Sequence, residues 1–173
     1  MLPLEGIFVV AVEQAVAAPF CTSRLADAGA TVVKVERPEG DFARFYDDAA
    51  KGQSSYFVWL NRGKQSLALD LKKGDDRAKL AALIAQSDIL VQNLRPRVLE
   101  RLGFGAASLA EQYPTLIQCS ISGFGEGGPL ASRKAYDLLI QAESGLCSVT
   151  GGPSEPARVG VSIVDIGPRT ARS

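Results

Sequence analysis

Asp165 is the residue whose surroundings most suggest chemistry, because it lies within an otherwise apolar run at residues 159–166. Burying an unpaired carboxylate costs on the order of several kcal/mol, so an aspartate among valines and isoleucines is usually hydrogen-bonded, ion-paired or catalytic. Taken alone, this local pattern favours a structural role. The alternative is a carboxylate that acts as a covalent nucleophile.

Histidine is absent from the 173 residues, and this restricts the chemistry. Its absence excludes Ser-His-Asp and Cys-His catalysis, imidazole bases and most catalytic zinc sites. The three cysteines, Cys21, Cys119 and Cys147, have neither a zinc-site spacing nor a disulfide pattern, so we expect buried free thiols and no metal site. Any catalysis would have to use carboxylates, Lys, Arg, Tyr, Ser or backbone groups.

The charge balance and the hydropathy pattern limit the partners. Nineteen basic residues balance nineteen acidic ones without a basic stripe, so nucleic acid is not expected as a partner. No apolar run approaches the roughly 20 residues that cross a bilayer, and no basic segment precedes the short apolar stretch near the N-terminus. We therefore predict a cytoplasmic protein without a membrane partner.

Several cations fall at the expected carboxyl ends of strands or in nearby loops: Arg37, Lys64, Lys72, Arg95, Arg97 and Arg101. A single Lys or Arg of this kind is usually only solvated surface. Together with the aromatic Phe45, Tyr56 and Trp59, such a set could bind the phosphates and stack the base of a nucleotide-like cofactor. The pattern suggests a nucleotide site, although neither a Gly-x-Gly-x-x-Gly loop nor a P-loop is present.

Short apolar runs rich in β-branched residues alternate with helical or loop stretches along the chain. These runs predict strands at residues 7–12, 31–35, 66–71, 88–91 and 115–121. Helices are expected at residues 19–28, followed by Gly29 as a C-terminal cap residue, and at residues 79–86. Strands that are apolar on both faces suit a parallel sheet covered by helices. The predicted fold class is α/β, a Rossmann-like, doubly wound, mostly parallel sheet with flanking helices.

Residues 36–63 form a long polar and aromatic stretch directly after a predicted strand. Open α/β sheets bind ligands in such loops. The local pattern favours a surface excursion over a small aromatic cluster, with a ligand-binding loop as the alternative.

A series of segments then adds a resemblance to a known family. The segments lie at residues 4–7, 18–22, 25–41, 60–72, 88–93, 101–104, 120–125 and 134–137, followed by the run around Asp165. In this order they resemble the N-terminal part of a family III CoA-transferase, a family that includes formyl-CoA and carnitine CoA-transferases and the related acyl-CoA racemases. Because nearly the whole chain is covered in order, the match is more specific than any single motif.

The resemblance implies a transfer of CoA between an acyl-CoA and a small carboxylic acid. The family's catalytic aspartate matches Asp165, which would attack the thioester to give a mixed anhydride and then an aspartyl-CoA thioester. A carboxylate nucleophile needs no histidine, so this chemistry agrees with the composition. The resemblance also implies coenzyme A as the bound substrate, no metal, and a homodimer.

The site residues are carried over one by one. Arg37 and Arg101 match positions that contact the nucleotide end of CoA, Lys72 is a weaker match of that kind, and Asn93 with Leu94 matches a stretch that lines the CoA cleft. Tyr136 occupies the position of an active-site tyrosine in the transferases and of a catalytic histidine in the racemases. Because a tyrosine is a poor substitute for imidazole as an acid or base, an acyl-CoA racemase is the less favoured alternative.

The sequence departs from the family after Ile166. Where the family continues into a long helix and a second small domain, residues 167–173 contain Pro168, two arginines and no amphipathic period. We therefore expect residues 1–166 to be the N-terminal part of the large domain, residues 167–173 to be an aberrant or disordered tail, and the second small domain to be absent. A chain truncated in this way would be inactive alone, and a non-catalytic CoA-binding or interaction fragment is the other alternative.

Overall fold

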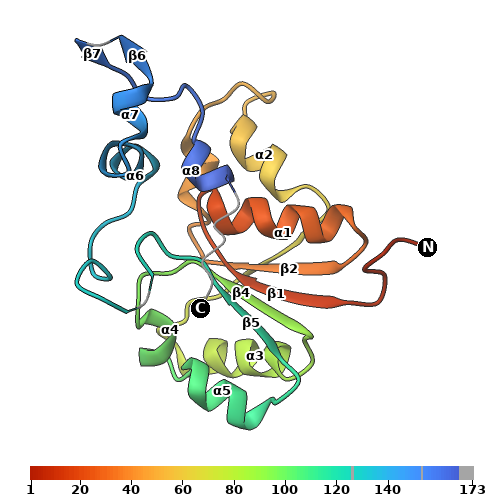
Figure 1. The fold of residues 1–173 in the computed structure, drawn as a ribbon. Coiled ribbons are helices and arrows are strands. Elements are labelled where there is room, and N and C mark those ends of the chain that lie inside the picture. Colours follow the sequence, from red (N-terminus) through yellow and green to blue (C-terminus); the bar gives the residue numbers. More distant parts are fainter. Residues whose placement is uncertain (126, 153, 168–173) are drawn as a thin grey trace. The chain divides into compact units, whose positions relative to one another are not determined.

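Five parallel strands form the sheet around which the first part of the chain folds (Figure 1). They are β1 (Phe8–Val12), β2 (Thr31–Glu36), β3 (Gln65–Ala68), β4 (Ile89–Gln92) and β5 (Ile117–Ser120). Their order across the sheet is β3-β2-β1-β4-β5, and every neighbouring pair is parallel. This order confirms the predicted doubly wound α/β class.

The computed structural model describes residues 1–125, 127–152 and 154–167. The chain divides into two compact units, Met1–Ile121 and Ser122–Ser173. The sheet belongs to the first unit. Each unit is described by itself below.

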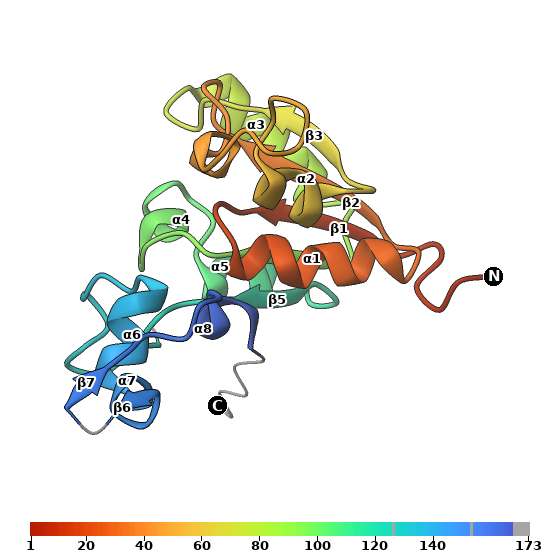
Figure 2. The same ribbon diagram turned by 90° about the horizontal axis from the view of Figure 1, so that it is seen from above.

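Helices cover both faces of the sheet (Figures 1 and 2). One face carries α1 (Ala17–Asp27) and α2 (Ser55–Asn61), and the other carries α3 (Gly74–Ile84), α4 (Val98–Arg101) and α5 (Ala106–Gln112). Alternate residues of the buried strands supply the two cores: Val10 faces the cluster that contains Leu80, whereas Val9 faces the cluster that contains Ala18. A strand buried on both faces is apolar throughout, which explains the continuous apolar runs in the sequence.

Gly29 ends α1 as the sequence predicted. Its N–H donates to the carbonyl of Ala26, the N–H of Ala30 donates to that of Leu25, and the φ angle of Gly29 is +104°. This pair of hydrogen bonds is a Schellman motif, which favours glycine at the left-handed position. A Cβ atom at Gly29 would also lie 2.6 Å from the Cβ of Leu2, so a larger residue would displace the N-terminal segment.

The stretch at residues 36–63 contains more regular structure than the sequence predicted. It includes a 3-10 helix, η1 (Phe42–Phe45), and the helix α2. Ser54 caps α2 by accepting a hydrogen bond from the N–H of Phe57, and Leu60 anchors the helix in the core. The expected aromatic cluster is present as a chain of ring contacts linking Phe20, Trp59, Tyr56, Tyr46 and Phe42.

The second unit consists of short elements. They are α6 (Asp137–Glu143), α7 (Leu146–Val149), the two-residue strands β6 (Gly151–Gly152) and β7 (Glu155–Pro156), and α8 (Ile163–Ile166). The helix α8 contains Asp165. Most of the predicted tail, residues 168–173, lies outside the described residues. No helix in the described part of the chain has the length and hydropathy to span a bilayer.

Candidate active site

The sheet has its topological switch point between β1 and β4, because the helices that follow these strands lie on opposite faces. Doubly wound folds bind ligands in the crevice at this point, outside the carboxyl ends of the strands. Asn93, the first residue after β4, spans it: its Oδ1 accepts from the N–H of Gln14 at 2.9 Å, and its Nδ2 donates to the Gln14 carbonyl at 2.8 Å. Asn93 therefore fixes the two segments that border the crevice, and its contact with CoA stays a prediction.

Ala15 carries the backbone strain at this point. Its φ angle is +63°, in the left-handed region that costs a non-glycine residue roughly 1–2 kcal/mol. The buried carboxylate of Asp41 holds it there, because the N–H of Ala15 donates to both Asp41 oxygens at 3.1 Å. The adjacent Val16 is buried and begins α1 as its N-terminal cap residue. The shape of the β1–α1 loop therefore depends on a side chain from the loop after β2.

A network of buried charges extends from Asp41. Lys34 Nζ donates to Asp41 Oδ2 at 2.8 Å and lies 3.7 Å from Glu13 Oε1. Lys64 Nζ lies 2.8 Å from the same Glu13 oxygen, and the Thr22 hydroxyl donates to Glu13 Oε2 at 2.7 Å. Each charge thus has an opposite partner within hydrogen-bonding distance, which offsets part of the cost of burying it.

Lys64 does not have the role that its position in the sequence predicts. Lys64 was grouped with cations that could bind phosphate, but its ammonium is buried against Glu13. Burial lowers the pKa of Lys64 to about 8, with Glu13 opposing the shift. Lys34, Glu13 and Asp41 were not predicted. The sequence did contain one signal for this network. Lys34 lies within the apolar strand β2, and a buried lysine needs a polar or acidic partner.

Glu36 forms a second charged cluster at the end of β2. Its carboxylate accepts from Arg44 at 3.1 and 2.6 Å, from the Ser66 hydroxyl at 2.5 Å and from the N–H of Asp41 at 2.8 Å. The Arg44 guanidinium also lies 3.8 Å from the ring centroid of Phe57. Burial alone would raise the pKa of Glu36, but the hydrogen bonds from Arg44, Ser66 and Asp41 outweigh it and lower the pKa to about 2.

This lowered pKa gives a test of the cluster. The pKa of Glu36 in the folded state lies below its ordinary value of 4.5, so Glu36 stabilises the fold above pH 4.5, and this contribution is lost as the pH falls toward 2. We expect Glu36→Gln to lower the free energy of unfolding at pH 7 by about 2 kcal/mol, and the difference from the wild type to shrink below pH 4. Urea unfolding across this range measures it. The exposed Glu39→Gln is the control, and a pH-independent difference for Glu36→Gln would contradict the assignment.

Arg37 lies beside this cluster and lines an open pocket of about 210 Å³. The lining residues are Glu36, Arg37, Pro38, Glu39, Gly40, Arg44, Ser66 and Ala68. Because Glu36 is already paired with Arg44, the exposed Arg37 keeps its guanidinium available at the rim. The pocket is smaller than a typical cofactor site of roughly 300–1,000 Å³, so it could hold only part of a nucleotide.

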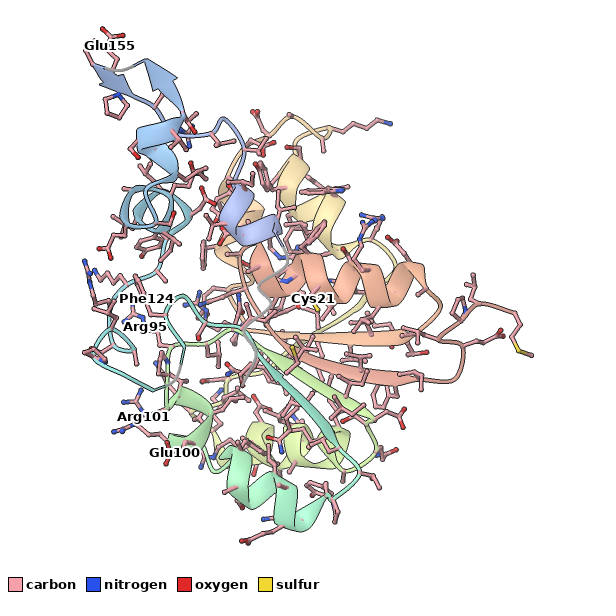
Figure 3. All side chains as sticks on the ribbon, in the orientation of Figure 1. Cys21, Arg95, Glu100, Arg101, Phe124 and Glu155 are labelled. Atoms are coloured by element: carbon pink, nitrogen blue, oxygen red, sulfur yellow. The ribbon has the colours of Figure 1, made fainter. Side chains whose placement is uncertain are left out.

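The other predicted CoA residues also follow strands of the first unit. Lys72 is exposed in the turn after β3, where its N–H donates to Asp70 Oδ1 at 3.1 Å. Leu94 is half-buried against the core. Arg101 is the last residue of α4, and Figure 3 shows its side chain pointing outward from the carboxyl edge of the sheet. The pocket at Arg37 does not include Arg101, so the predicted common cleft for these two arginines stays a prediction.

Asp165 lies in the second unit, on the short helix α8. The α8 segment is held by Asp137 on α6, whose Oδ1 accepts from the N–H of Val164 at 2.8 Å and from that of Asp165 at 3.4 Å. Asp137 thus satisfies amides at the start of α8 from outside the helix, which fixes the backbone that carries Asp165. Asp165 is half-buried and makes further interactions with other residues of the structure.

Gln141, one turn after Asp137, holds the chain that leads into α8. It is fully buried, accepts from the N–H of Val159 at 2.8 Å and donates to Asp137 Oδ2 at 2.6 Å. Neither Asp137 nor Gln141 was assigned a role from the sequence, although their spacing of four residues on one helix face was visible. Tyr136 precedes Asp137 as the N-terminal cap residue of α6 and is exposed.

The fold and the switch-point crevice define a doubly wound α/β protein, and the comparison with known families gives its class. The model of CoA-transferase family III matches residues 4–170. The chain belongs to CoA-transferase family III.

Named relatives and solved structures agree with this assignment. The chain is similar to an acetyl-CoA:oxalate CoA-transferase of Acetobacter aceti, with 44% identity over 91% of this chain and 41% of the relative. It is 38% identical to a human succinyl-CoA:glutarate CoA-transferase over 95% of this chain and 38% of the relative. A CAIB/BAIF family protein from Brucella suis superposes with a TM-score of 0.90 at 38% identity, covering 95% of this chain and 45% of that one. The chain therefore spans about two fifths of the length of these curated relatives.

Proposed function

We propose that this chain carries the CoA-binding part and the nucleophile of a CoA-transferase that moves CoA between an acyl-CoA and a carboxylic acid. The observation that carries the proposal is that one family match, at residues 4–170, includes both the switch point of the sheet and the Asp165 segment. In the relatives' names the acids differ, oxalate in one and glutarate in another, so the proposal extends to carboxylic acids as a class.

Asp165 is the proposed nucleophile. A carboxylate oxygen of Asp165 attacks the thioester carbon of the acyl-CoA, the C–S bond breaks, and CoA leaves as a thiolate. The thiolate then attacks the Asp165 carbonyl of the mixed anhydride, which releases the first acid and leaves an aspartyl-CoA thioester. The second carboxylic acid takes CoA from this thioester and returns Asp165 to its free form.

Asp137 and Gln141 serve this chemistry as positioning residues. Their hydrogen bonds to Val159, Val164 and Asp165 fix the backbone that leads into and carries the nucleophile. A carboxylate that attacks a carbon must be held in a narrow range of positions, and a misplacement of about 1 Å can cost roughly 100-fold in rate. The buried amide of Gln141 is suited to this role because its own oxygen and nitrogen are both occupied.

CoA binding is assigned to the carboxyl edge of the sheet. Arg37 follows β2 and Arg101 follows β4, with β1 between those strands. Neighbouring strands are about 4.8 Å apart, so the ends of β2 and β4 are separated by roughly 10 Å. One extended CoA molecule would lie along this edge, with its phosphates at Arg37 and at Arg101 on α4, and its arm along Asn93 and Leu94. The exposed Lys72, in the turn after β3, adds a third positive charge to Arg37 and Arg101.

Calorimetry tests this binding site. Charge-assisted hydrogen bonds to phosphate contribute about 1.5–3 kcal/mol each, so Arg37→Ala and Arg101→Ala should each weaken CoA binding by roughly 10- to 150-fold. Arg24→Ala is the matched control, because Arg24 is an exposed arginine on α1 that pairs with Asp27. Unchanged CoA affinity in both test variants would remove the assignment of the carboxyl edge.

The remaining predictions from the sequence belong to the same proposal. We propose that residues 1–166 correspond to the N-terminal part of a large CoA-transferase domain and that the homodimer of the family applies to the whole protein. Transfer to a second acid is expected to need groups outside these 173 residues, because the matches cover only 38–41% of the relatives. A non-catalytic CoA-binding fragment is the second candidate. It predicts CoA binding without any covalent step at Asp165.

A further inference from the structure

One buried carboxylate connects the pocket at Arg37 with the β1–α1 loop. Asp41 follows Gly40, which lines that pocket, and it is 2% exposed. Its N–H donates to Glu36 Oε2 at 2.8 Å, so the backbone of Asp41 is fixed to a second lining residue of the pocket. Its carboxylate reaches a different part of the chain, because both oxygens accept from the N–H of Ala15 at 3.1 Å. A single residue therefore joins the pocket to the loop after β1.

Further hydrogen bonds fix the carboxylate of Asp41 in place. Its Oδ1 accepts from the N–H of Ala43 at 3.0 Å, and its Oδ2 accepts from Lys34 Nζ at 2.8 Å. Ala43 belongs to η1 and Lys34 to the buried strand β2, so two separate elements hold the same side chain. The two Asp41 oxygens therefore form a fixed anchor for the β1–α1 loop.

The loop conformation that Asp41 holds is disfavoured in an isolated chain. The φ angle of Ala15 is +63°, in the left-handed region that disfavours alanine by about 5- to 30-fold. The preceding residue, Gln14, is bound through its N–H and its carbonyl by the side chain of Asn93. Because the proposed CoA arm lies along Asn93, the conformation of Ala15 affects the surface that the arm contacts. A loop released from Asp41 would fit CoA only in a fraction of the molecules, which weakens the apparent affinity by that fraction.

We propose that Asp41 is a positioning residue for CoA, which holds the β1–α1 loop in the left-handed conformation that the arm of CoA requires. It acts through Ala15 and does not contact CoA, since its side chain is buried. This role rests on the proposed CoA site. It differs from a purely structural role in one respect. The nucleotide end of CoA at Arg37 should bind without the Asp41 carboxylate, because the contact from Asp41 to Glu36 uses a backbone N–H that no side-chain substitution removes.

Calorimetry of Asp41→Asn with two ligands tests this role. We expect CoA to bind about 5- to 30-fold more weakly than to the wild type. Adenosine 3′,5′-bisphosphate, which has the nucleotide end of CoA without the arm, should bind both chains equally. Adding Ala15→Gly to Asp41→Asn should restore most of the CoA affinity, because glycine adopts the left-handed conformation without a steric penalty. Asp48→Asn, at an exposed aspartate of the same stretch, is the matched control and should bind both ligands like the wild type.

Substitutions of Ala15 alone leave the buried network intact and test the role even where Asp41→Asn does not fold. Ala15→Val should weaken the binding of CoA and not that of the bisphosphate, because a β-branched side chain is strongly disfavoured at positive φ. Ala15→Gly should bind both ligands like the wild type. A CoA affinity that does not respond to Ala15→Val, or an equal loss of both ligands in a folded Asp41→Asn chain, would overturn this role alone. A wild-type chain that binds neither ligand would overturn the proposed CoA site and this role with it.

Discussion

Asp165→Asn is expected to abolish the covalent step. The chain is incubated with an acyl-CoA and hydroxylamine, which converts an anhydride or thioester at a protein carboxylate into a hydroxamate. The wild-type chain should acquire this group with time, because hydroxylamine competes with water for the activated aspartate. An asparagine side chain is neutral and a poor nucleophile, so the labelling rate should fall by on the order of 10³-fold or more. Intact mass measured over time gives both rates.

Two comparisons make this result specific. Asp75→Asn changes an exposed aspartate at the start of α3 and should label like the wild type. A steady-state assay with a second carboxylic acid in place of hydroxylamine should show no measurable transfer by the 173-residue chain, because both substrates must be positioned and water excluded for that step. If Asp165→Asn and the wild type are labelled at the same rate, Asp165 is not the nucleophile, and the chain is better described as a non-catalytic CoA-binding fragment.

Lys34→Met is expected to have the largest effect on stability. The substitution removes the buried partner of Asp41 and leaves a carboxylate that is 2% exposed without its ammonium ion. Breaking one side of a buried ion pair costs about 3–5 kcal/mol, a large part of the total stability of a domain. Because Asp41 also holds the N–H of Ala15, the amide of Ala15 should lose protection from hydrogen exchange. Urea unfolding and amide exchange measure the two effects.

Lys79→Met is the matched control for Lys34→Met. Lys79 pairs with Asp76 at 2.7 Å on the exposed side of α3. Solvent-exposed pairs of this kind contribute only about 0–1 kcal/mol. If Lys34→Met costs as little as Lys79→Met, then the buried network does not hold the β1–α1 loop in its strained conformation.

The fold could be predicted from the sequence because its strongest signals are local. Strands buried on both faces are mostly apolar, and α1 ends where Gly29 supplies the left-handed residue of its Schellman motif. The helix α2 was missed for a physical reason. Its residues Tyr56, Phe57 and Trp59 have modest helix propensity, and its stability comes from the Ser54 cap and from the burial of Leu60.

The candidate site was predicted only where a residue could be matched by type and position. The family resemblance named Asp165 and Arg37, whereas the contacts between residues far apart in the sequence were not predicted. Glu13 and Lys64 form their ion pair across 51 positions in the sequence, and Asp137 reaches α8 across 27 positions. Such pairs are set by the tertiary fold, and a single sequence contains no signal for which charges will meet.

The most direct test of the account is to find the residue that carries the covalent label. After reaction with an acyl-CoA and hydroxylamine, trypsin should release residues 159–169 as one peptide that contains Asp165 as its only carboxylate side chain. The account predicts that this peptide is heavier by about 15 Da, the mass change from a carboxylate to a hydroxamate, and that fragmentation places the change on Asp165. A label on Glu13, Asp41 or Asp137, or an unlabelled 159–169 peptide in a chain that binds CoA, would contradict it.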